Sequence, residues 1–173
     1  MLNPIDVDTV VRDGGAHGRF PGQIHAGVAW WMAACFVVTV RARRLVVAHD
    51  GKPASVEFFD RLCQGAVNAQ HYACQVLDRG QADEVALLAA MRQAGDAPGI
   101  LVTTKETGGD TVQISIALYG RGGKPLDEPG GLAAIRRMIA EDRVPVPVNE
   151  TSKGRVQPFT TASGEDTSSD QCG

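Results

Sequence analysis

The stretch GILVTTKETGGDTVQISIALYGRGGKPL, residues 99–126, places a lysine among threonine hydroxyls directly after an apolar run. The run predicts a strand, and we expect the polar segment that follows it, with Lys105 at its centre, to be a loop. An ammonium group attracts anions but is a poor phosphoryl carrier, whereas the hydroxyls of Thr103, Thr104 and Thr107 can accept a phosphoryl group. Phosphate binding is therefore the chemistry that this segment indicates, and a solvated polar turn is the alternative.

A second pair of polar residues, His49 and Asp50, ends another apolar run. The carboxyl ends of parallel strands meet at one edge of an open α/β sheet, where helix N-termini point and ligands bind. We therefore expect this pair to lie at the same edge as Lys105, with His49 among the phosphate-binding residues. Asp50 also has a simpler interpretation, which is that it caps the turn after the strand.

The order of strands and helices predicts the scaffold that positions these residues. We expect strands at 43–50, 72–78, 99–104 and 111–119, and helices at 26–40, 55–67, 82–95 and 129–142. Residues 111–119 alternate between apolar and polar, which is typical of a half-exposed, antiparallel edge strand after a hairpin-like loop. The order indicates an α/β fold, a three-layer α/β/α sandwich with a mostly parallel, mixed sheet and an antiparallel edge strand.

The chain is predicted to have three parts. Residues 1–20 end in the glycine-rich string GGAHGRF and are interpreted as an N-terminal leader loop. Residues 21–142 hold the α/β/α domain. Residues 143–173 are rich in Ser, Thr, Pro and Gly and poor in periodic apolar positions, which predicts a mostly disordered tail.

Composition and charge limit the classes of binding partner and the cellular location that we expect. The formal net charge of −3 gives no support to nucleic-acid binding, and the basic cluster Arg41, Arg43 and Arg44 is interpreted as a solvated strand entrance. The apolar segment 26–40 has 15 residues, short of the roughly 20 that span a bilayer, so we expect no membrane contact. The N-terminal segment is unlike a secretory signal, which predicts a cytoplasmic protein.

Cysteine and histidine spacing gives no metal signature. The 4 cysteines contain no C-x-x-C pair, and the 4 histidines are scattered without ligand spacing. No G-x-G-x-x-G motif follows a predicted strand, so the sequence gives no support to a nicotinamide or flavin cofactor. We therefore expect neither a metal nor a cofactor.

Several strings, in order, resemble the first domain of the α-D-phosphohexomutases, the phosphomannomutase and phosphoglucomutase family. The segment LVVAHDGKPASVEFFDRLCQGAVNAQ is similar to the family's V-V-V-G-R-D-x-R-x-S-S-P-E. Asp50, Lys52, Ser55 and Glu57 match its D, second R, second S and E. GGKPL followed by GGLAAIRRMI is similar to the segment that ends this domain. The resemblance covers roughly residues 10–142 and stops where a family member would continue into three further domains.

The resemblance adds two residues to the expected phosphate site. It gives Lys52 the position of a family arginine. The early glycines are similar to the family's G-T-S-G-x-R-G loop, with His17 in place of its arginine. We therefore expect Lys52 and His17 to join Lys105, the flanking threonines and His49 around a phosphate.

The family's T-A-S-H-N-P motif should follow the GILV strand, where this chain reads T-T-K-E-T-G. Lys105 stands at the position of the serine that carries the phosphoryl group and helps bind magnesium in the family. The resemblance thus implies a stand-alone domain of carbohydrate metabolism without mutase activity or a catalytic residue of its own. It would bind a phosphosugar, phosphate, or a protein partner such as a second copy of the chain.

Two alternatives stay open. The chain is a subunit of a split phosphohexomutase, an intramolecular phosphotransferase that acts through a loop threonine. A one-residue shift of the motif gives Thr104 the serine position, and magnesium would be needed only in such a complete mutase. The other alternative is a truncated gene product without a selected function.

Overall fold

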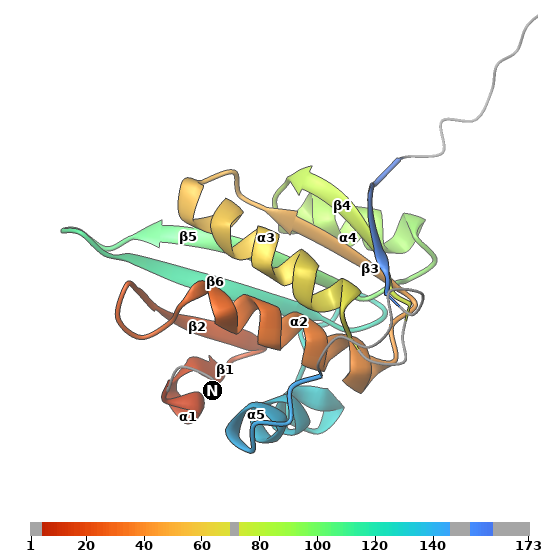
Figure 1. Cartoon of the computed structure of the whole chain (residues 1–173). Coiled ribbons are helices and arrows are strands. Elements are labelled where there is room, and N and C mark those ends of the chain that lie inside the picture. Colours follow the sequence, from red (N-terminus) through yellow and green to blue (C-terminus); the bar gives the residue numbers. More distant parts are fainter. Residues whose placement is uncertain (1–4, 70–72, 146–152, 161–173) are drawn as a thin grey trace, which may run out of the picture.

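The computed structural model describes residues 5–69, 73–145 and 153–160, and within them a seven-stranded sheet forms the centre of the molecule (Figure 1). The strand order is β1-β2-β6-β5-β3-β4-β7. The strands are β1 (Val11–Arg12), β2 (Gly15–Phe20), β3 (Arg44–His49), β4 (Gln75–Gln81), β5 (Gly99–Glu106), β6 (Val112–Tyr119) and β7 (Arg155–Pro158). β3 is parallel to β4 and β5, and β4 is parallel to β7. β6 is antiparallel to β5 and β2, and β1 is antiparallel to β2.

Five of these seven strands therefore run in one direction, and β1 and β6 run against them. The mixed, mostly parallel sheet predicted from the sequence is confirmed. The two short strands β1 and β7 form its edges.

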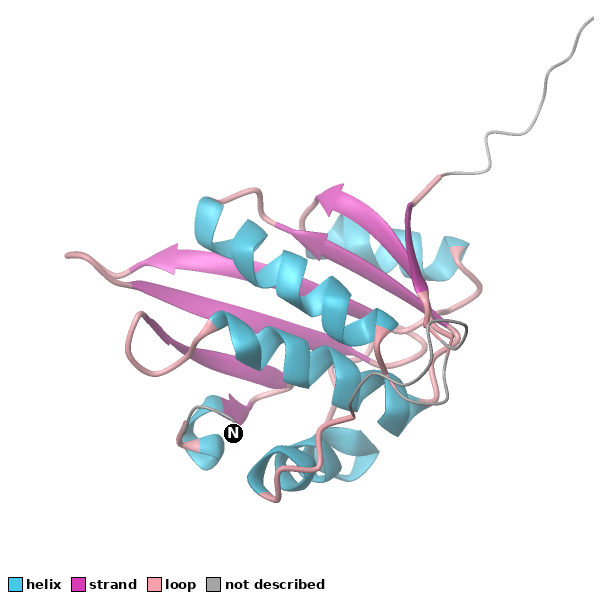
Figure 2. Cartoon of the chain, in the orientation of Figure 1, coloured by secondary structure: helices cyan, strands magenta, loops and turns pink. Residues whose placement is uncertain are grey.

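Helices cover both faces of the sheet (Figure 2). They are α1 (Val7–Val10), α2 (Ala26–Val40), α3 (Pro53–Val67), α4 (Glu84–Gln93) and α5 (Ala133–Ala140), with a π-helical turn η1 (Glu128–Leu132) before α5. Alternate residues of the strands separate the two cores. Leu45 and Val47 pack in the core shared with α2 and α3, whereas Val46 and Ala48 pack in the core shared with α4. The predicted three-layer sandwich is confirmed.

Helix α2 is apolar on nearly all sides and is buried between the sheet and its neighbouring helices. Its contact with α3 is close at Gly65, where an added Cβ would lie 2.2 Å from the carbonyl oxygen of Trp30. The length of α2 is 15 residues. Across the described ranges, no helix combines the length and the apolar character that crossing a membrane requires.

The prediction of a leader loop at residues 1–20 is wrong for residues 5–20, and residues 1–4 lie outside the described ranges. Asp6 caps α1 by accepting a hydrogen bond from the backbone N–H of Thr9 at 3.2 Å, and β2 pairs with β6 along its whole length. The predicted edge strand 111–119 is therefore internal, although it is antiparallel as expected. The glycines of β2 carry no side chains, so the strand lacks the alternating apolar pattern by which sequence analysis identifies strands. Gly15 lies so close to β6 that an added Cβ would be 1.8 Å from the carbonyl oxygen of Ile116.

Part of the predicted disordered tail is also a strand. β7 runs parallel to β4, with register partners from Gln75↔Arg155 to Asp78↔Pro158. Its residues are exposed and number only four, which is too few for a periodic signal. The predicted tail residues 146–152 and 161–173 lie outside the described residues.

The role of β2 can be tested with Gly15→Ala. The new methyl group would meet backbone of β6, so we expect a loss of about 1–3 kcal/mol in the free energy of unfolding, measured by urea denaturation. Gly120→Ala is the matched control, because its Cβ would meet no atom closer than 3.8 Å and Gly120 has no positive φ. Equal stability of the two variants would contradict the pairing of β2 with β6.

Candidate functional site

The candidate site lies where β3, β5 and the start of α3 meet at the carboxyl edge of the parallel strands. β3 ends at His49, and Gly51 turns the chain with a φ of +82°. Lys52 then occupies the N-cap position of α3. Pro53 opens the helix, where its fixed φ suits the first turn and its missing N–H costs nothing. These backbone constraints place the side chains of this turn against the end of β5.

Asp50 joins the three segments. Its carboxylate accepts hydrogen bonds from the backbone N–H of Thr104 at 2.7 Å and from that of Lys52 at 3.1 Å. Burial alone would raise the pKa of Asp50, but the Thr104 N–H, the Ser55 hydroxyl, the Lys52 N–H and the Lys52 charge together lower it below the ordinary value of 3.8. The carboxylate thus caps the turn, as its simpler interpretation predicted.

Further hydrogen bonds fix Thr104 against α3. The hydroxyls of Ser55 and Thr104 lie 2.6 Å apart, and these residues are 0% and 6% exposed. The Lys52 ammonium donates to the carbonyl oxygen of Thr104 at 2.6 Å. The Thr104 hydroxyl is therefore both occupied and shielded from solvent, and the Lys52 ammonium is directed at the protein backbone.

Lys105 does not lie in a loop, so that expectation is wrong. β5 continues through Lys105 to Glu106 because its pairing with β6 extends beyond the apolar residues, and the turn comes later, at Gly108 and Gly109 with φ of +84° and +74°. Strand alternation puts Lys105 on the sheet face opposite to Thr104, the face that α4 covers in part. Lys105 is exposed and makes no hydrogen bond or ion pair with any residue in the described ranges.

Two residues that sequence analysis did not identify share this face. Gln113 of β6 is the register partner of Lys105, and Arg19 of β2 is the register partner of Gln113. Directly opposed residues of antiparallel strands point to the same face, with Cβ atoms about 4.5–5.5 Å apart. Lys105, Gln113 and Arg19 therefore form a row across three strands, which we call the Lys105 row. It has a cation at each end.

A pocket of about 570 Å³ opens on the same face. It is lined by Asp50, Gln81, Ala82, Asp83, Glu84, Leu101 and Thr103. Thr103 is half-buried and lies two residues before Lys105 on β5, so its side chain is on the same face as the Lys105 row and lines the pocket beside it. Asp83 caps α4 by accepting the backbone N–H of Ala86 at 2.8 Å. Its position directly after a strand, at the start of a helix, was a sequence signal that could have identified this acidic wall.

Three other predicted site residues already have partners within the protein. The His49 ring packs edge-on against Phe59 with centroids 4.7 Å apart, and its Nδ1 lies 3.0 Å from the N–H of Gly51. The Thr107 hydroxyl donates to the carbonyl oxygen of Thr111 at 3.0 Å within the hairpin loop. His17 on β2 shares the face of the Lys105 row, but its Nδ1 already lies 3.0 Å from the hydroxyl oxygen of Ser115, the register partner of Thr103.

The family resemblance implies magnesium only where the chain is part of a complete mutase. Both oxygens of Asp50 already accept backbone N–H groups. In the part of the chain that the structure describes, no group of three or more His, Cys, Asp or Glu residues could hold a metal ion. The described side chains at this edge do not by themselves fit a magnesium site.

Asp50→Asn tests the connecting role of the carboxylate. We expect a loss of about 1–3 kcal/mol in the free energy of unfolding near neutral pH, because a charged acceptor of two hydrogen bonds is replaced. The pKa of Asp50 is lowered in the folded state, so its stabilisation is present above the unfolded-state pKa and is lost as pH falls through the folded-state pKa. Urea denaturation at about pH 6 and about pH 3 should show the difference between wild type and variant shrinking at the lower pH. A constant difference would contradict this role.

Two solved structures share the fold of this chain. A phosphoglucomutase/phosphomannomutase family protein from Burkholderia thailandensis matches 90% of this chain over 34% of its own length, with a TM-score of 0.68 and 19% identity. A putative phosphomannomutase from Thermus thermophilus matches 86% of the chain over 33% of its own length, with a TM-score of 0.59 and 16% identity. No protein-family model and no curated protein matches the sequence. The chain thus spans about a third of these structures, 34% and 33%, and has the fold of that part, as the sequence resemblance predicted.

Proposed function

We propose that this chain is a phosphohexomutase domain I-like module of carbohydrate metabolism that binds a hexose phosphate and does not itself carry a phosphoryl group. The observation that carries the proposal is the contrast between neighbours on β5. The Thr104 hydroxyl is buried against Ser55, whereas Lys105 is exposed and has no partner among the described residues. The hydroxyl is closed to a substrate and the cation is open to an anion.

The Lys105 row suits a phosphate group. Lys105 and Arg19 supply cations, and the Gln113 amide between them supplies N–H donors. Charge-assisted hydrogen bonds from such groups to phosphate oxygens are stronger than neutral ones. The Thr103 hydroxyl adds a donor on the side of the pocket. Of the phosphate-binding residues predicted from the sequence, Lys105 and Thr103 keep this role in the proposal.

The acidic pocket suits a sugar better than a phosphate. Asp83 and Glu84 line it, and ionised carboxylates accept hydrogen bonds from hydroxyls but repel anions. A hexose phosphate can meet both conditions, with its hydroxyls toward the pocket and its phosphate toward Lys105. The fold shared with a phosphoglucomutase/phosphomannomutase family protein supports the same ligand class. A cytoplasmic location and the absence of nucleic-acid partners stay predictions.

Ligand binding can be measured as a shift in melting temperature. With mannose 1-phosphate or glucose 1-phosphate at about a hundred times Kd, we expect roughly 5 °C or more of stabilisation, and a smaller shift with inorganic phosphate. Lys105→Ala should abolish the shift and Lys105→Arg should retain most of it. Lys124→Ala removes an exposed lysine from the turn after β6 and should leave the shift unchanged. An unchanged melting temperature with both hexose phosphates would contradict the proposal and favour a protein partner.

The absence of phosphoryl transfer is a separate expectation. After incubation with a hexose bisphosphate and magnesium, the intact mass of the protein should stay unchanged. The Thr104 hydroxyl is held by Ser55 and the Thr107 hydroxyl by Thr111, and no described side chain is hydrogen-bonded to the Thr103 hydroxyl as a base that would activate it. A stoichiometric gain of one phosphoryl group on Thr103, Thr104 or Thr107 would refute this part of the proposal. It would support the split phosphohexomutase that acts through a threonine.

A further inference from the structure

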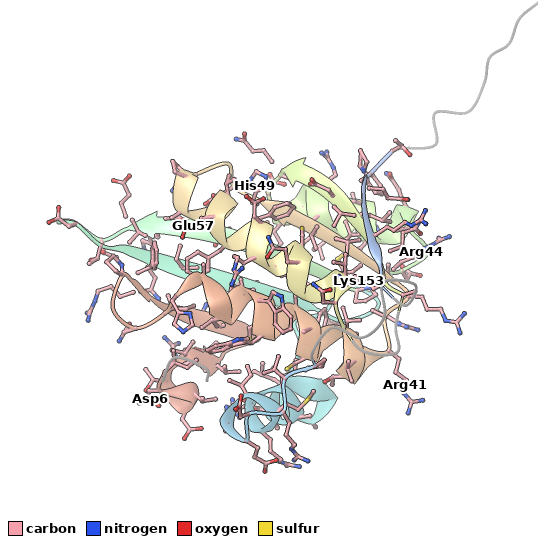
Figure 3. All side chains as sticks on the ribbon, in the orientation of Figure 1. Asp6, Arg41, Arg44, His49, Glu57 and Lys153 are labelled. Atoms are coloured by element: carbon pink, nitrogen blue, oxygen red, sulfur yellow. The ribbon has the colours of Figure 1, made fainter. Side chains whose placement is uncertain are left out.

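A second pocket of about 570 Å³ lies at the amino-terminal end of the parallel strands and is rich in arginine. It is lined by Arg41, Arg43, Arg44, Ala94, Gly95, Asp96, Ala97, Pro98 and Arg121. Figure 3 shows Arg41 and Arg44 at the opposite end of the sheet from His49 and Glu57. The arginines come from two places in the sequence, the segment from the end of α2 to the first residue of β3 and the turn after β6. We call this set the arginine pocket.

The positive charge of the arginine pocket is largely uncompensated. Asp96 is its single carboxylate, and no ion pair joins Asp96 to these arginines in the described ranges. Arg41, Arg43 and Arg44 are exposed, and their guanidinium groups form no hydrogen bond or ion pair with any described residue. Guanidinium groups stay charged at all physiological pH values, so the cluster is under mutual repulsion that a bound anion would relieve.

The backbone that carries these arginines is anchored. Arg41 adopts the left-handed conformation with φ of 52° at the end of α2, and the next residue, Ala42, is fully buried. Arg121 donates hydrogen bonds to the carbonyl oxygens of Val40 at 3.4 Å and Arg41 at 3.2 Å, which ties the turn after β6 to the same helix end. The backbone from which these side chains project is thus fixed, and the Arg121 guanidinium is held in place before any ligand binds, which lowers the entropy cost of binding.

We propose that the arginine pocket binds a compact polyphosphate anion, either the phosphate chain of a nucleotide or a free polyphosphate. Guanidinium groups match phosphate oxygens with paired N–H donors, and three unpartnered cations exceed the charge of a single phosphate group. The remaining lining residues are Ala, Gly and Pro with one Asp, and none is aromatic. The pocket therefore recognises the phosphate chain and offers no stacking surface for a base. This site is independent of the Lys105 row.

Isothermal titration calorimetry with tripolyphosphate, ATP and a short DNA duplex tests the proposal. We expect both small anions to bind, with affinity falling as salt rises. Arg43→Gln/Arg44→Gln should weaken tripolyphosphate binding by about tenfold for each arginine, or about a hundredfold together. Arg61→Gln/Arg137→Gln removes the same charge from exposed positions on α3 and α5 and should change Kd by less than about threefold. Arg44→Gln alone serves as the milder variant should the double variant fail to fold.

The outcomes separate the sources and the sites. Equal affinity for ATP and tripolyphosphate supports recognition of the phosphate chain, and loss of ATP binding alone assigns the site to free polyphosphate. Lys105→Ala should retain tripolyphosphate binding. Loss of binding in this variant would place the anion at the carboxyl edge of the sheet and overturn the inference. Absence of binding, equal weakening by both double variants, or tighter binding of the DNA duplex than of tripolyphosphate would also overturn it.

Discussion

The Asp50 carboxylate accepts a backbone hydrogen bond from β5 at the point where strand pairing between β3 and β5 ends. The parallel ladder stops at His49↔Val102, and the last backbone hydrogen bond runs from the N–H of Asp50 to the carbonyl oxygen of Val102. Two residues later, the N–H of Thr104 donates to the side chain of Asp50 instead of to a strand. This hydrogen bond satisfies the Thr104 N–H at the point where β5 leaves β3 and continues beside β6.

The orientation of the candidate site follows from that bond. With Thr104 held against Ser55 on the α3 side, strand alternation directs Thr103 and Lys105 to the opposite face. Pairing with β6 then adds Gln113, and pairing of β6 with β2 adds Arg19. One buried hydroxyl contact and two strand registers therefore determine which side chains of this edge are open to a ligand.

Sequence analysis predicted the parts of this fold that have a local apolar signal. The strands and helices with apolar runs were recovered, but β2 was not, because Gly15 and Gly18 are needed for close approach and leave little periodicity. Lys105 was assigned to a loop because the apolar run ends before it. The antiparallel ladder with β6 nevertheless continues through these polar residues, and backbone pairing leaves no apolar signal in the sequence. Arg19 reaches the Lys105 row through the pairing of β2 with β6, and Arg121 reaches the arginine pocket through hydrogen bonds to the end of α2. Both contacts join residues far apart in the sequence, so no local pattern predicts them.

The two edges of the sheet handle charge differently, and helix dipoles explain why. α3 and α4 begin at the carboxyl edge, where their N-termini are already satisfied by the protein's own acids, Asp50 beside α3 and Asp83 on α4. An anion at this edge therefore meets cations on the open sheet face. It does not meet free helix N-termini, although the sequence analysis expected helix N-termini to point at the ligand. α2 and α4 end at the other edge, where the partial negative charge of helix C-termini stabilises nearby arginines such as Arg41. That edge can thus hold a cluster of cations that the rest of this acidic chain does not neutralise.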